Sequence, residues 1–322
     1  MNATDSRAEY RSLCDSEPDI PLFLQAWWLD ATCTEDGWDV ALVEKGGRIH
    51  AALPYLPIRQ RGFRVLSQPA LTPFLGPWLS PSNAKTANDL SRQKDLMLAL
   101  IAGLPAYDYY RQNWSPKVNN WLPFYWGGFS QSTRYTYVIP ALGDESTLWQ
   151  QLRDNVRTDI RKAQNRFGVT VGEGTLAELI ALNDMTFQRQ GQKRAYSDDF
   201  LIRVDQACVE RQCRRIFIAR DGQGRPHAGA YVVWDRHTAY YLIGGGDPSL
   251  RNSGATSLCI WEAIRFAAGV SSRFDFEGSM IEPIERFFRA FGAEQVPYFQ
   301  ISRAGSRLFS SLQALKSLVR RK

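Results

Sequence analysis

The residues best suited to hold a charged ligand lie in the segment YYLIGGGDPSLRNSGATSLCIWEAIRFA, which begins at Tyr240. A strand is predicted over Tyr240 to Ile243, three glycines and a polar loop follow it, and a helix is predicted to begin near Gly254. Glycine lets the backbone approach a ligand closely, and the unpaired amides at a helix start attract phosphate. A glycine-rich strand-to-helix turn is merely a turn, without a bound ligand, about as often as it is a phosphate site. As a phosphate site, the segment offers Ile243, Gly244, Arg251, Gly254, Ala255 and Thr256.

Two carboxylates are candidates for moving a proton. Asp275 and Glu277 lie two residues apart in the predicted strand RFDFE, so their side chains are expected on one face. Glu277, at the strand end, is the preferred general base. Asp275 is better explained by structure, because Asp108 holds the matching place in the first half. A tyrosine hydroxyl could protonate a leaving group, although packed tyrosines are common; the candidates are Tyr240, Tyr241 and Tyr298.

A second group of polar residues could bind an acceptor molecule. Arg153, Arg157 and Arg161 recur at four-residue spacing in a predicted basic helix and therefore share one face. This face either binds the phosphates of an acceptor or is simply solvated, as most charge runs are. A predicted helix break and a later aromatic pair add further candidates, which are Gln188, Arg189, Tyr196 and Arg289.

The composition limits the compartment and the ligands. With three histidines, five scattered cysteines and no His/Cys/carboxylate cluster, no metal site is expected. The cysteines are expected to be reduced thiols, which indicates the cytoplasm, and neither an export signal nor a membrane span is expected. The net charge of +6 favours an anionic partner: a cofactor phosphate, a nucleotide, RNA or an acidic membrane, but not DNA.

The chain contains one structural unit twice. WDVALVEKGGRIHAALPYLPI and RRIFIARDGQGRPHAGAYVVW each read as a β-hairpin with a His-Ala pair after the turn. A predicted helix and a short aromatic strand follow each hairpin, and 322 residues suit two domains. We therefore expect an α/β (α+β) protein of two tandem domains, each a mixed twisted β-sheet flanked by helices, over residues 1–143 and 144–304.

The remaining segment, 305–322, is expected to be a basic amphipathic helix. Its apolar stripe comprises Leu308, Leu312, Leu315 and Val319, and basic residues surround and follow this stripe. Such a helix either docks on its own protein or binds the inner membrane peripherally.

Several of these segments resemble one protein family. The loop from Arg251 to Thr256 is similar to the Arg/Gln-x-x-Gly-x-Gly/Ala loop that binds the coenzyme A pyrophosphate in the GNAT acetyltransferase superfamily, with Thr256 departing at the last small residue. NVRTDIRKAQNRFGVTV and FDFEGSMIEPIERFFRAFGAEQVPYFQISR resemble the FemAB-like acyltransferases, also described as BioF2-like acetyltransferase domains. The resemblance is good from about Leu152 to Arg303 and weaker before Pro140. It implies two tandem GNAT-like domains, the first without a phosphate loop.

The resemblance also implies an activity. An N-acyltransferase of this family would move an acyl group from a thioester, acyl-CoA, to an amine acceptor in cell-envelope or polysaccharide biosynthesis, with no tightly bound cofactor. The alternative is an aminoacyl-tRNA-dependent transferase that acts on a peptidoglycan precursor. It is less favoured because Phe287 and Phe288 stand where relatives often have Phe-Lys, and because a long helical-hairpin insertion is missing. A third reading is a non-catalytic binding protein on the same fold.

Overall fold

The chain folds into two compact units. The computed structural model describes residues 3–34, 36–278, 280–306, 309 and 311. Unit 1 contains the residues up to Arg134 and the segment that begins at Pro297, and unit 2 is Tyr135–Val296. The expected helix over 305–322 lies almost entirely outside the described residues.

This division differs from the expected ranges 1–143 and 144–304 because two strands run from one unit into the other. β6 (Ser130–Ile139) begins in unit 1 and pairs through Val138 and Ile139 with β11 of unit 2. β12 (Glu294–Ala304) begins in unit 2 and pairs from Gln300 onward with β5 of unit 1. A strand that follows one unit in sequence therefore completes the sheet of the other.

Unit 1 contains a mixed sheet in the order β1-β2-β3-β5-β12. The hairpin of β1 and β2 turns at Gly46 and Gly47, which both have positive φ, as such tight turns require. β3 is antiparallel to β2 and parallel to β5, and α3 makes the connection that a parallel pair needs. The elements of unit 1 are α1 (Ala3–Ser16), η1 (Leu22–Leu24), α2 (Ala26–Cys33), β1 (Asp39–Lys45), β2 (Arg48–Gln60), β3 (Phe63–Ser67), β4 (Trp78–Leu79), α3 (Thr86–Gly103), β5 (Tyr109–Asn113) and α4 (Leu122–Trp126).

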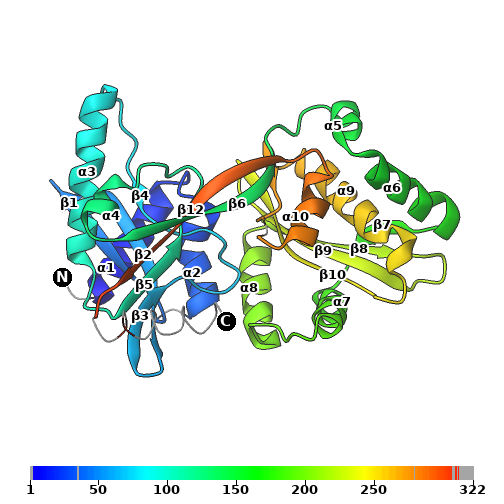
Figure 1. The fold of residues 1–322 in the computed structure, drawn as a ribbon, viewed down its shortest axis with the longest axis horizontal. Coiled ribbons are helices and arrows are strands. Elements are labelled where there is room, and N and C mark those ends of the chain that lie inside the picture. The colour runs from blue at the N-terminus through cyan, green and yellow to red at the C-terminus, as the bar shows by residue number, and fades with distance from the viewer. Residues whose placement is uncertain (1–2, 35, 279, 307–308, 310, 312–322) are drawn as a thin grey trace. The chain divides into compact units, whose positions relative to one another are not determined.

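Unit 2 repeats this plan with the order β6-β11-β10-β9-β8-β7. β8 and β9 form the hairpin, β10 is antiparallel to β9, and α9 leads to β11, which is parallel to β10. The predicted mixed α/β fold is confirmed (Figure 1). The elements of unit 2 are α5 (Glu145–Gln151), α6 (Asp154–Phe167), β7 (Thr170–Glu173), α7 (Leu176–Arg189), α8 (Asp198–Glu210), β8 (Arg214–Arg220), β9 (Pro226–Trp234), β10 (Thr238–Gly246), η2 (Arg251–Ser253), α9 (Ala255–Ala267), β11 (Arg273–Asp275) and α10 (Glu282–Arg289).

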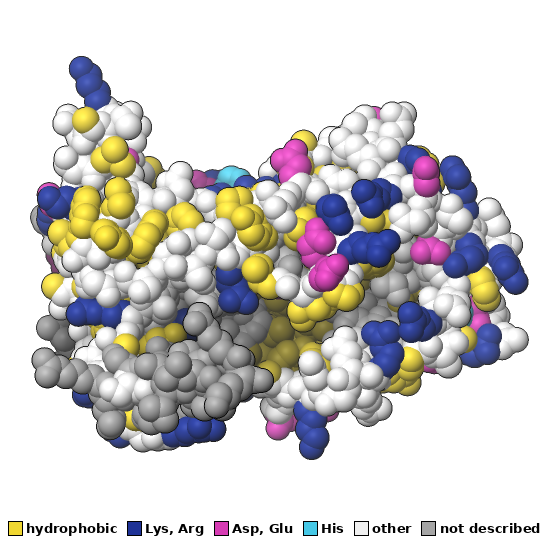
Figure 2. Space-filling view, viewed as in Figure 1, with side chains coloured by type: hydrophobic (Ala, Val, Ile, Leu, Met, Phe, Trp, Pro, Cys, Tyr) yellow, Lys and Arg dark blue, Asp and Glu magenta, His cyan; other side chains and the backbone are white. Residues whose placement is uncertain are grey.

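The charged side chains of unit 2 are dispersed over its surface. Figure 2 shows Lys and Arg side chains in dark blue over the visible face of this unit, with Asp and Glu side chains among them. The net charge of +6 is therefore not gathered into one patch on this face.

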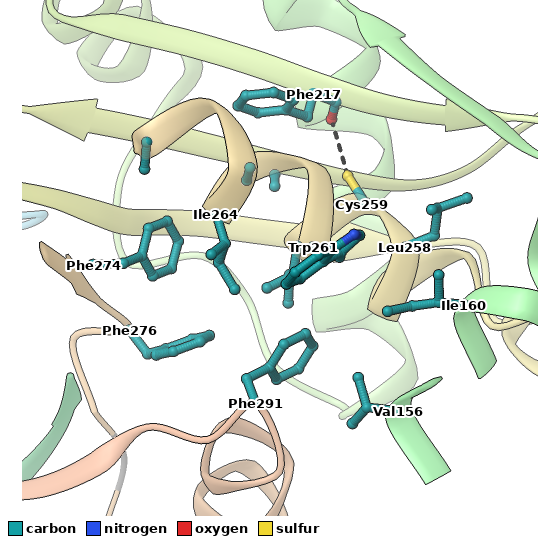
Figure 3. Close-up of a cluster of buried hydrophobic side chains, with 14 of the residues drawn as sticks. Val156, Ile160, Phe217, Leu258, Cys259, Trp261, Ile264, Phe274, Phe276 and Phe291 are labelled. Atoms are coloured by element: carbon teal, nitrogen blue, oxygen red, sulfur yellow. Dashed lines mark hydrogen bonds between the residues drawn. The ribbon is translucent and has the colours of Figure 1, made fainter. Parts of the chain in front are cut away.

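Helix α9 is the centre of the unit 2 core. It is apolar on most of its sides, as is typical of a helix that is covered all round. Trp261 and Ile264 pack among aromatic rings that include Phe276 and Phe291, and the Cys259 thiol donates to the carbonyl oxygen of Phe217 at 3.5 Å (Figure 3). This packing fixes the start of α9, which borders the cavity described below.

Candidate active site

Unit 2 contains a cavity of about 780 Å³ along the end of β10, which we call the β10 cavity. The parallel pairing of β10 with β11 stops at Tyr240 and Asp275. The next amide, of Phe276, donates to the carbonyl oxygen of Tyr137 on β6 at 2.9 Å, whereas β10 continues to Gly246 paired only with β9. The cavity is lined by this part of β10, the loop after it, the start of α9, the end of α7 and α10.

The glycines at this site are required by contacts within the protein. A Cβ on Gly244 would overlap the hydroxyl of Tyr241, one on Gly245 would meet the α7 backbone at Asn183, and one on Gly254 would overlap the carbonyl oxygen of Asp159. Gly254 also has a φ of 82°, which favours glycine. The close backbone approach that the sequence suggests for a ligand is thus made by α7 and α6 at two of these positions.

Four of the six predicted phosphate-site residues line the β10 cavity and two do not. The four are Gly244, Arg251, Gly254 and Thr256. Ile243 and Ala255 are buried, and Ile243 follows a register shift in the pairing of β10 with β9 that separates it from Tyr241.

The start of α9 is fixed by a buried network of three side chains. Ser253 Oγ accepts from the Ala255 amide at 3.3 Å and lies 2.9 Å from His227 Nδ1. His227 Nε2 lies 3.2 Å from Asp221 Oδ2. The order Asp, His, Ser is that of a nucleophilic triad, but Ser253 is buried and does not line the cavity. We call these three residues the Ser253 network and assign it to holding the helix start.

The first turn of α9 presents donors to the β10 cavity. Gly254 holds the N-cap position of α9. Because glycine has no side chain, Gly254 provides no side-chain acceptor for the amides of Thr256 and Ser257. Both residues line the cavity. Free amides at a helix start, together with the helix dipole, suit an anionic group.

Two arginines add positive charge to the same cavity. Among the described residues, none offers Arg189 or Arg251 an ion pair or a side-chain hydrogen bond. Of the two acids that line the cavity, Asp159 is paired with Lys162 at 2.8 Å, and Asp247 accepts from the amide and hydroxyl of Ser249. Arg189 was suggested by the sequence only as a neighbour of the helix break.

The two candidate bases, Asp275 and Glu277, are closely coupled but lie outside the lining of the β10 cavity. β11 ends at Asp275, and Glu277 has a positive φ of 59°, so the two side chains do not share a strand face as expected. A turn joins them instead: Asp275 Oδ1 accepts from the Glu277 amide at 2.7 Å and from Thr136 Oγ1 at 2.5 Å.

Burial perturbs both carboxyls. It raises the pKa of Asp275 to about 6, although the two hydrogen bonds oppose the shift. The pKa of Glu277 is raised well above its ordinary value by burial and by the neighbouring Asp275 charge. Glu277 is partly exposed as a residue, but its Oε1 is inaccessible and has no hydrogen-bond partner among the described residues.

The three candidate tyrosines lie in different surroundings. Tyr298 lies in unit 1, where its ring packs edge-on against Phe74 at 4.9 Å. Tyr240 is buried in β10. Tyr241 lines the β10 cavity, its ring stands edge-on to Phe288 at 5.9 Å, and burial raises its pKa so that it stays protonated at neutral pH. Tyr241 is the tyrosine placed to meet a ligand, and the glycine three residues later was the available sequence signal.

Apart from Arg189, the predicted acceptor residues do not line the β10 cavity. Arg157 donates to the carbonyl oxygen of Gln150 at 3.1 Å, and Arg161 lies over the Trp149 ring at 5.6 Å, so these two arginines contact α5. The residue of α6 that reaches the cavity is Asp159. The other predicted residues are exposed or paired elsewhere: Arg153 and Gln188 are exposed, Tyr196 donates to Asn183 at 3.5 Å, and Arg289 pairs with Glu285 at 3.0 Å.

The described residues lack two further features. That part of the chain contains no group of three or more His, Cys, Asp or Glu side chains that could hold a metal ion. None of its helices is both long and apolar enough to cross a membrane.

Comparison with known proteins identifies the fold. Residues 150–288 match the family model described as an acetyltransferase (GNAT) domain. The solved structure of FemX is similar over 93% of this chain and 96% of that chain, with a TM-score of 0.64 and 13% sequence identity. The L-PGS structure from Bacillus licheniformis is similar over 97% and 96%, with a TM-score of 0.53 and 12% identity.

A third similar structure is the C-terminal domain of a putative lysylphosphatidylglycerol synthetase from Agrobacterium fabrum, which covers 98% of this chain and 97% of that one, with a TM-score of 0.52 and 16% identity. Among curated protein sequences, no match was found. The chain has a GNAT fold, and the predicted resemblance to the FemAB-like and BioF2-like branch is confirmed at the level of the fold.

Proposed function

We propose that the protein is an N-acyltransferase that moves an acyl group from an acyl-CoA thioester to an amine acceptor in cell-envelope or polysaccharide biosynthesis. One observation carries the proposal: the β10 cavity combines three features that match such a donor. These are the first turn of α9, whose N-cap Gly254 has no side chain, two arginines without an ion pair among the described residues, and apolar side chains of α10. A CoA thioester has the same two parts, an anionic pyrophosphate and a largely uncharged arm. The match of residues 150–288 to a GNAT domain supports the same activity.

In this proposal the donor is held by its phosphates. The amides of Thr256 and Ser257 and the guanidinium of Arg251 bind the pyrophosphate, with Arg189 beside them. The thioester then lies along β10, where the backbone beyond Tyr240 is no longer paired with β11. Fixing the carbonyl in this way supplies much of the catalysis, because acyl transfer to an amine depends chiefly on orientation and on stabilising the oxyanion.

Two proton transfers complete the reaction. The amine nitrogen attacks the thioester carbon, a C–N bond forms, the C–S bond breaks, and the amine loses one proton to a base while the departing thiolate gains one. Tyr241 is the proposed acid because it lines the β10 cavity and keeps its proton at neutral pH. Glu277 lies outside the lining of the β10 cavity, but it is kept as the proposed base because its buried Oε1 is unpartnered among the described residues and its raised pKa makes the ionised form a stronger base.

Substitution of Glu277 tests the role of this residue. Glu277→Gln is nearly isosteric but cannot take a proton, so the transfer rate should fall roughly 100-fold while the melting temperature is retained. A variant as fast as the wild type at its own optimal pH would assign Glu277 to structure.

The donor assignment is tested by calorimetric titration of CoA and acetyl-CoA, followed by an assay of free thiol release in the presence of amines. Saturable CoA binding and amine-dependent thiol release are expected. Absence of CoA binding by the folded protein would overturn the thioester proposal, and binding without turnover of any acyl donor would favour the non-catalytic reading.

The aminoacyl-tRNA-dependent transferase remains a second candidate because the fold resembles FemX over nearly the whole chain. Exposed arginines such as Arg153 and Arg161 would contact RNA phosphates in that case. A filter-binding titration with tRNA at two salt concentrations distinguishes the two, since phosphate contacts give a steep loss of affinity as salt rises. Tight, salt-sensitive tRNA binding without CoA binding would favour this candidate.

We propose the cytoplasm as the compartment, with residues 305–322 docking on the protein or on the inner membrane. Flotation of anionic vesicles with and without these residues tests the membrane contact. Equal partition of both forms would exclude it.

A further inference from the structure

Helix α10 carries its apolar and charged residues on different sides. Ile284, Phe287 and Phe288 line the β10 cavity together with Ile281, the residue that precedes the helix. Their three- and four-residue spacing places them on one face. The charged residues of the helix lie between them and face elsewhere: Glu282, Glu285, Arg286 and Arg289.

This apolar face continues into the core of unit 2. The Phe288 ring packs at 5.0 Å from Phe276 and stands edge-on to Tyr241, and Phe287 packs edge-on against Phe291 at 5.3 Å. Phe288 is buried, whereas Ile284 and Phe287 are only partly buried. We call Ile281, Ile284, Phe287, Phe288 and Tyr241 the apolar wall. The core supports Phe287, Phe288 and Tyr241 from behind, so the shape of this part of the wall is set before a ligand binds, whereas Ile281 is exposed.

One acid of α10 is already compensated. Glu285, on the same helix, accepts from the Tyr137 hydroxyl at 2.8 Å and pairs with Arg289 at 3.0 Å. The acids that do line the cavity, Asp159 and Asp247, come from α6 and from the loop beside the two arginines. The wall itself therefore provides no carboxylate that could pair with an ammonium group, and an unpaired charge is costly to bury.

We infer that the acyl group of the donor is an uncharged apolar chain or ring that packs against the apolar wall, and is not an aminoacyl group. This inference rests on the proposed thioester-dependent function and specifies its substrate class. Phe288, in the place where relatives often have a lysine, contributes directly to the specificity, because it replaces a charged contact by an aromatic one.

Affinity should therefore rise with the length of the acyl chain. Each methylene transferred from water to an apolar site gains about 0.8 kcal/mol, which corresponds to roughly fourfold in affinity. The experiment is calorimetric titration of CoA, acetyl-CoA, butyryl-CoA and hexanoyl-CoA into the full chain. A stepwise gain is expected until the chain exceeds the wall.

A donor pair of matched length but different charge makes the test specific. Heptanoyl-CoA and ε-aminocaproyl-CoA have nearly equal chain length, but the second ends in an ammonium group. The apolar donor should bind at least about tenfold more tightly, because the wall cannot pair the charge. Equal affinities, or tighter binding of the charged donor, would overturn the inference.

Substitutions on the wall localise the effect. Phe287→Ala should reduce the gain in affinity per methylene, which is measured relative to the affinity of the same variant for CoA itself. Ile284→Ser serves as the second variant if Phe287→Ala does not fold. Ile202→Ala is the control, since Ile202 is an exposed α8 residue that does not line the β10 cavity. Loss of CoA binding in the wild type would refute the proposed function, whereas CoA binding with no chain-length dependence would refute only this inference.

Discussion

Gly254 packs directly against the backbone of Asp159, so that a Cβ at position 254 would overlap the Asp159 carbonyl oxygen. Gly254 precedes α9 and Asp159 lies in the middle of α6, so the two helices meet here without an intervening side chain. The contact sets where the first turn of α9 stands, and Thr256 and Ser257 of that turn line the β10 cavity.

Gly254→Val should therefore unfold the site as well as weaken donor binding. The left-handed conformation costs a branched residue about 1 to 2 kcal/mol, and the overlap adds roughly 1 to 3 kcal/mol. Urea denaturation should show a loss of stability of this combined size. Gly168→Ala is the control, since Gly168 also has a positive φ but has open space around its Cα. Equal losses in the two variants would contradict the packing role of Gly254.

The two unpaired arginines should contribute separately to donor affinity. Arg251→Ala and Arg189→Ala each remove one charge-assisted contact, so each variant is expected to bind CoA about tenfold more weakly. Arg161→Ala should leave the affinity unchanged, because Arg161 lies over Trp149 and does not line the cavity. Calorimetry at low and high salt checks this, and an equal effect of all three variants would point to a nonspecific charge effect instead.

The two arms of His227 in the Ser253 network can be tested one at a time. An asparagine amide can replace Nδ1, which faces Ser253, whereas a glutamine amide can replace Nε2, which faces Asp221. Because Ser253 accepts from the first amide of α9, His227→Asn should retain CoA affinity. His227→Gln and Ser253→Ala should each weaken it about fivefold, the value of one hydrogen bond.

A matched control for this network exists in unit 1. His50 follows the turn of the first hairpin, as His227 follows the turn of the second, and its Nδ1 lies 3.5 Å from Ser80 Oγ. His50→Gln should leave CoA affinity unchanged, since Ser80 lies in unit 1 and does not line the β10 cavity. Wild-type affinity in a folded Ser253→Ala variant would restrict the network to stability.

The elements of the fold could be predicted from the sequence because they depend on local signals. The turns at Gly46-Gly47 and after Asp221, with branched residues on both sides, predict both hairpins, and the helix before β11 follows from its apolar residues. The exchange of β6 and β12 could not be predicted. Pairing partners are determined by tertiary packing. In sequence β6 follows unit 1 but pairs with β11 of unit 2, and β12 follows unit 2 but pairs with β5 of unit 1.

The candidate site shows the same limit at individual residues. Arg251 and Thr256 could be found by the loop pattern, which is local. Position 245 requires a glycine because it contacts the backbone of α7, about sixty residues away in sequence. A local sequence pattern cannot predict such a contact. The four-residue spacing places Arg157 and Arg161 on one face of α6, but it does not predict that both contact α5 or that Arg153 precedes the helix as its N-cap.

Asp275 should make unfolding depend on pH. Its pKa is about 6 in the folded chain against an ordinary value of 3.8, so the folded state holds an extra proton between these values. The associated stability is fully present below pH 3.8 and is lost as the pH rises through 6, by on the order of 3 kcal/mol. Asp275→Asn should remove this part of the slope in urea denaturation measured from pH 4 to 7.

Asp108→Asn provides the opposite control for this slope. The pKa of Asp108 is lowered by the Arg64 amide, so its contribution changes only below the ordinary range of an aspartate. The Asp108→Asn variant should keep the wild-type slope between pH 4 and 7. An unchanged slope in Asp275→Asn would mean that the buried proton resides elsewhere.

Tyr241 should assist departure of the thiolate. Its hydroxyl lies over Gly244 at the β10 cavity, and Tyr241→Phe removes this hydroxyl while keeping the ring against Phe288. The rate with acetyl-CoA should fall by roughly 100-fold, as for loss of a general acid, with CoA affinity unchanged. A donor whose thiol is far more acidic, such as an aryl thioester, leaves without needing the proton, so its rate should fall much less. Tyr240→Phe is the matched control, because Tyr240 is buried in β10 and does not line the cavity. Stopped-flow measurement of thiol release with both donors decides the role. Equal slowing for the alkyl and aryl thioesters would show that Tyr241 positions the donor and does not supply the proton.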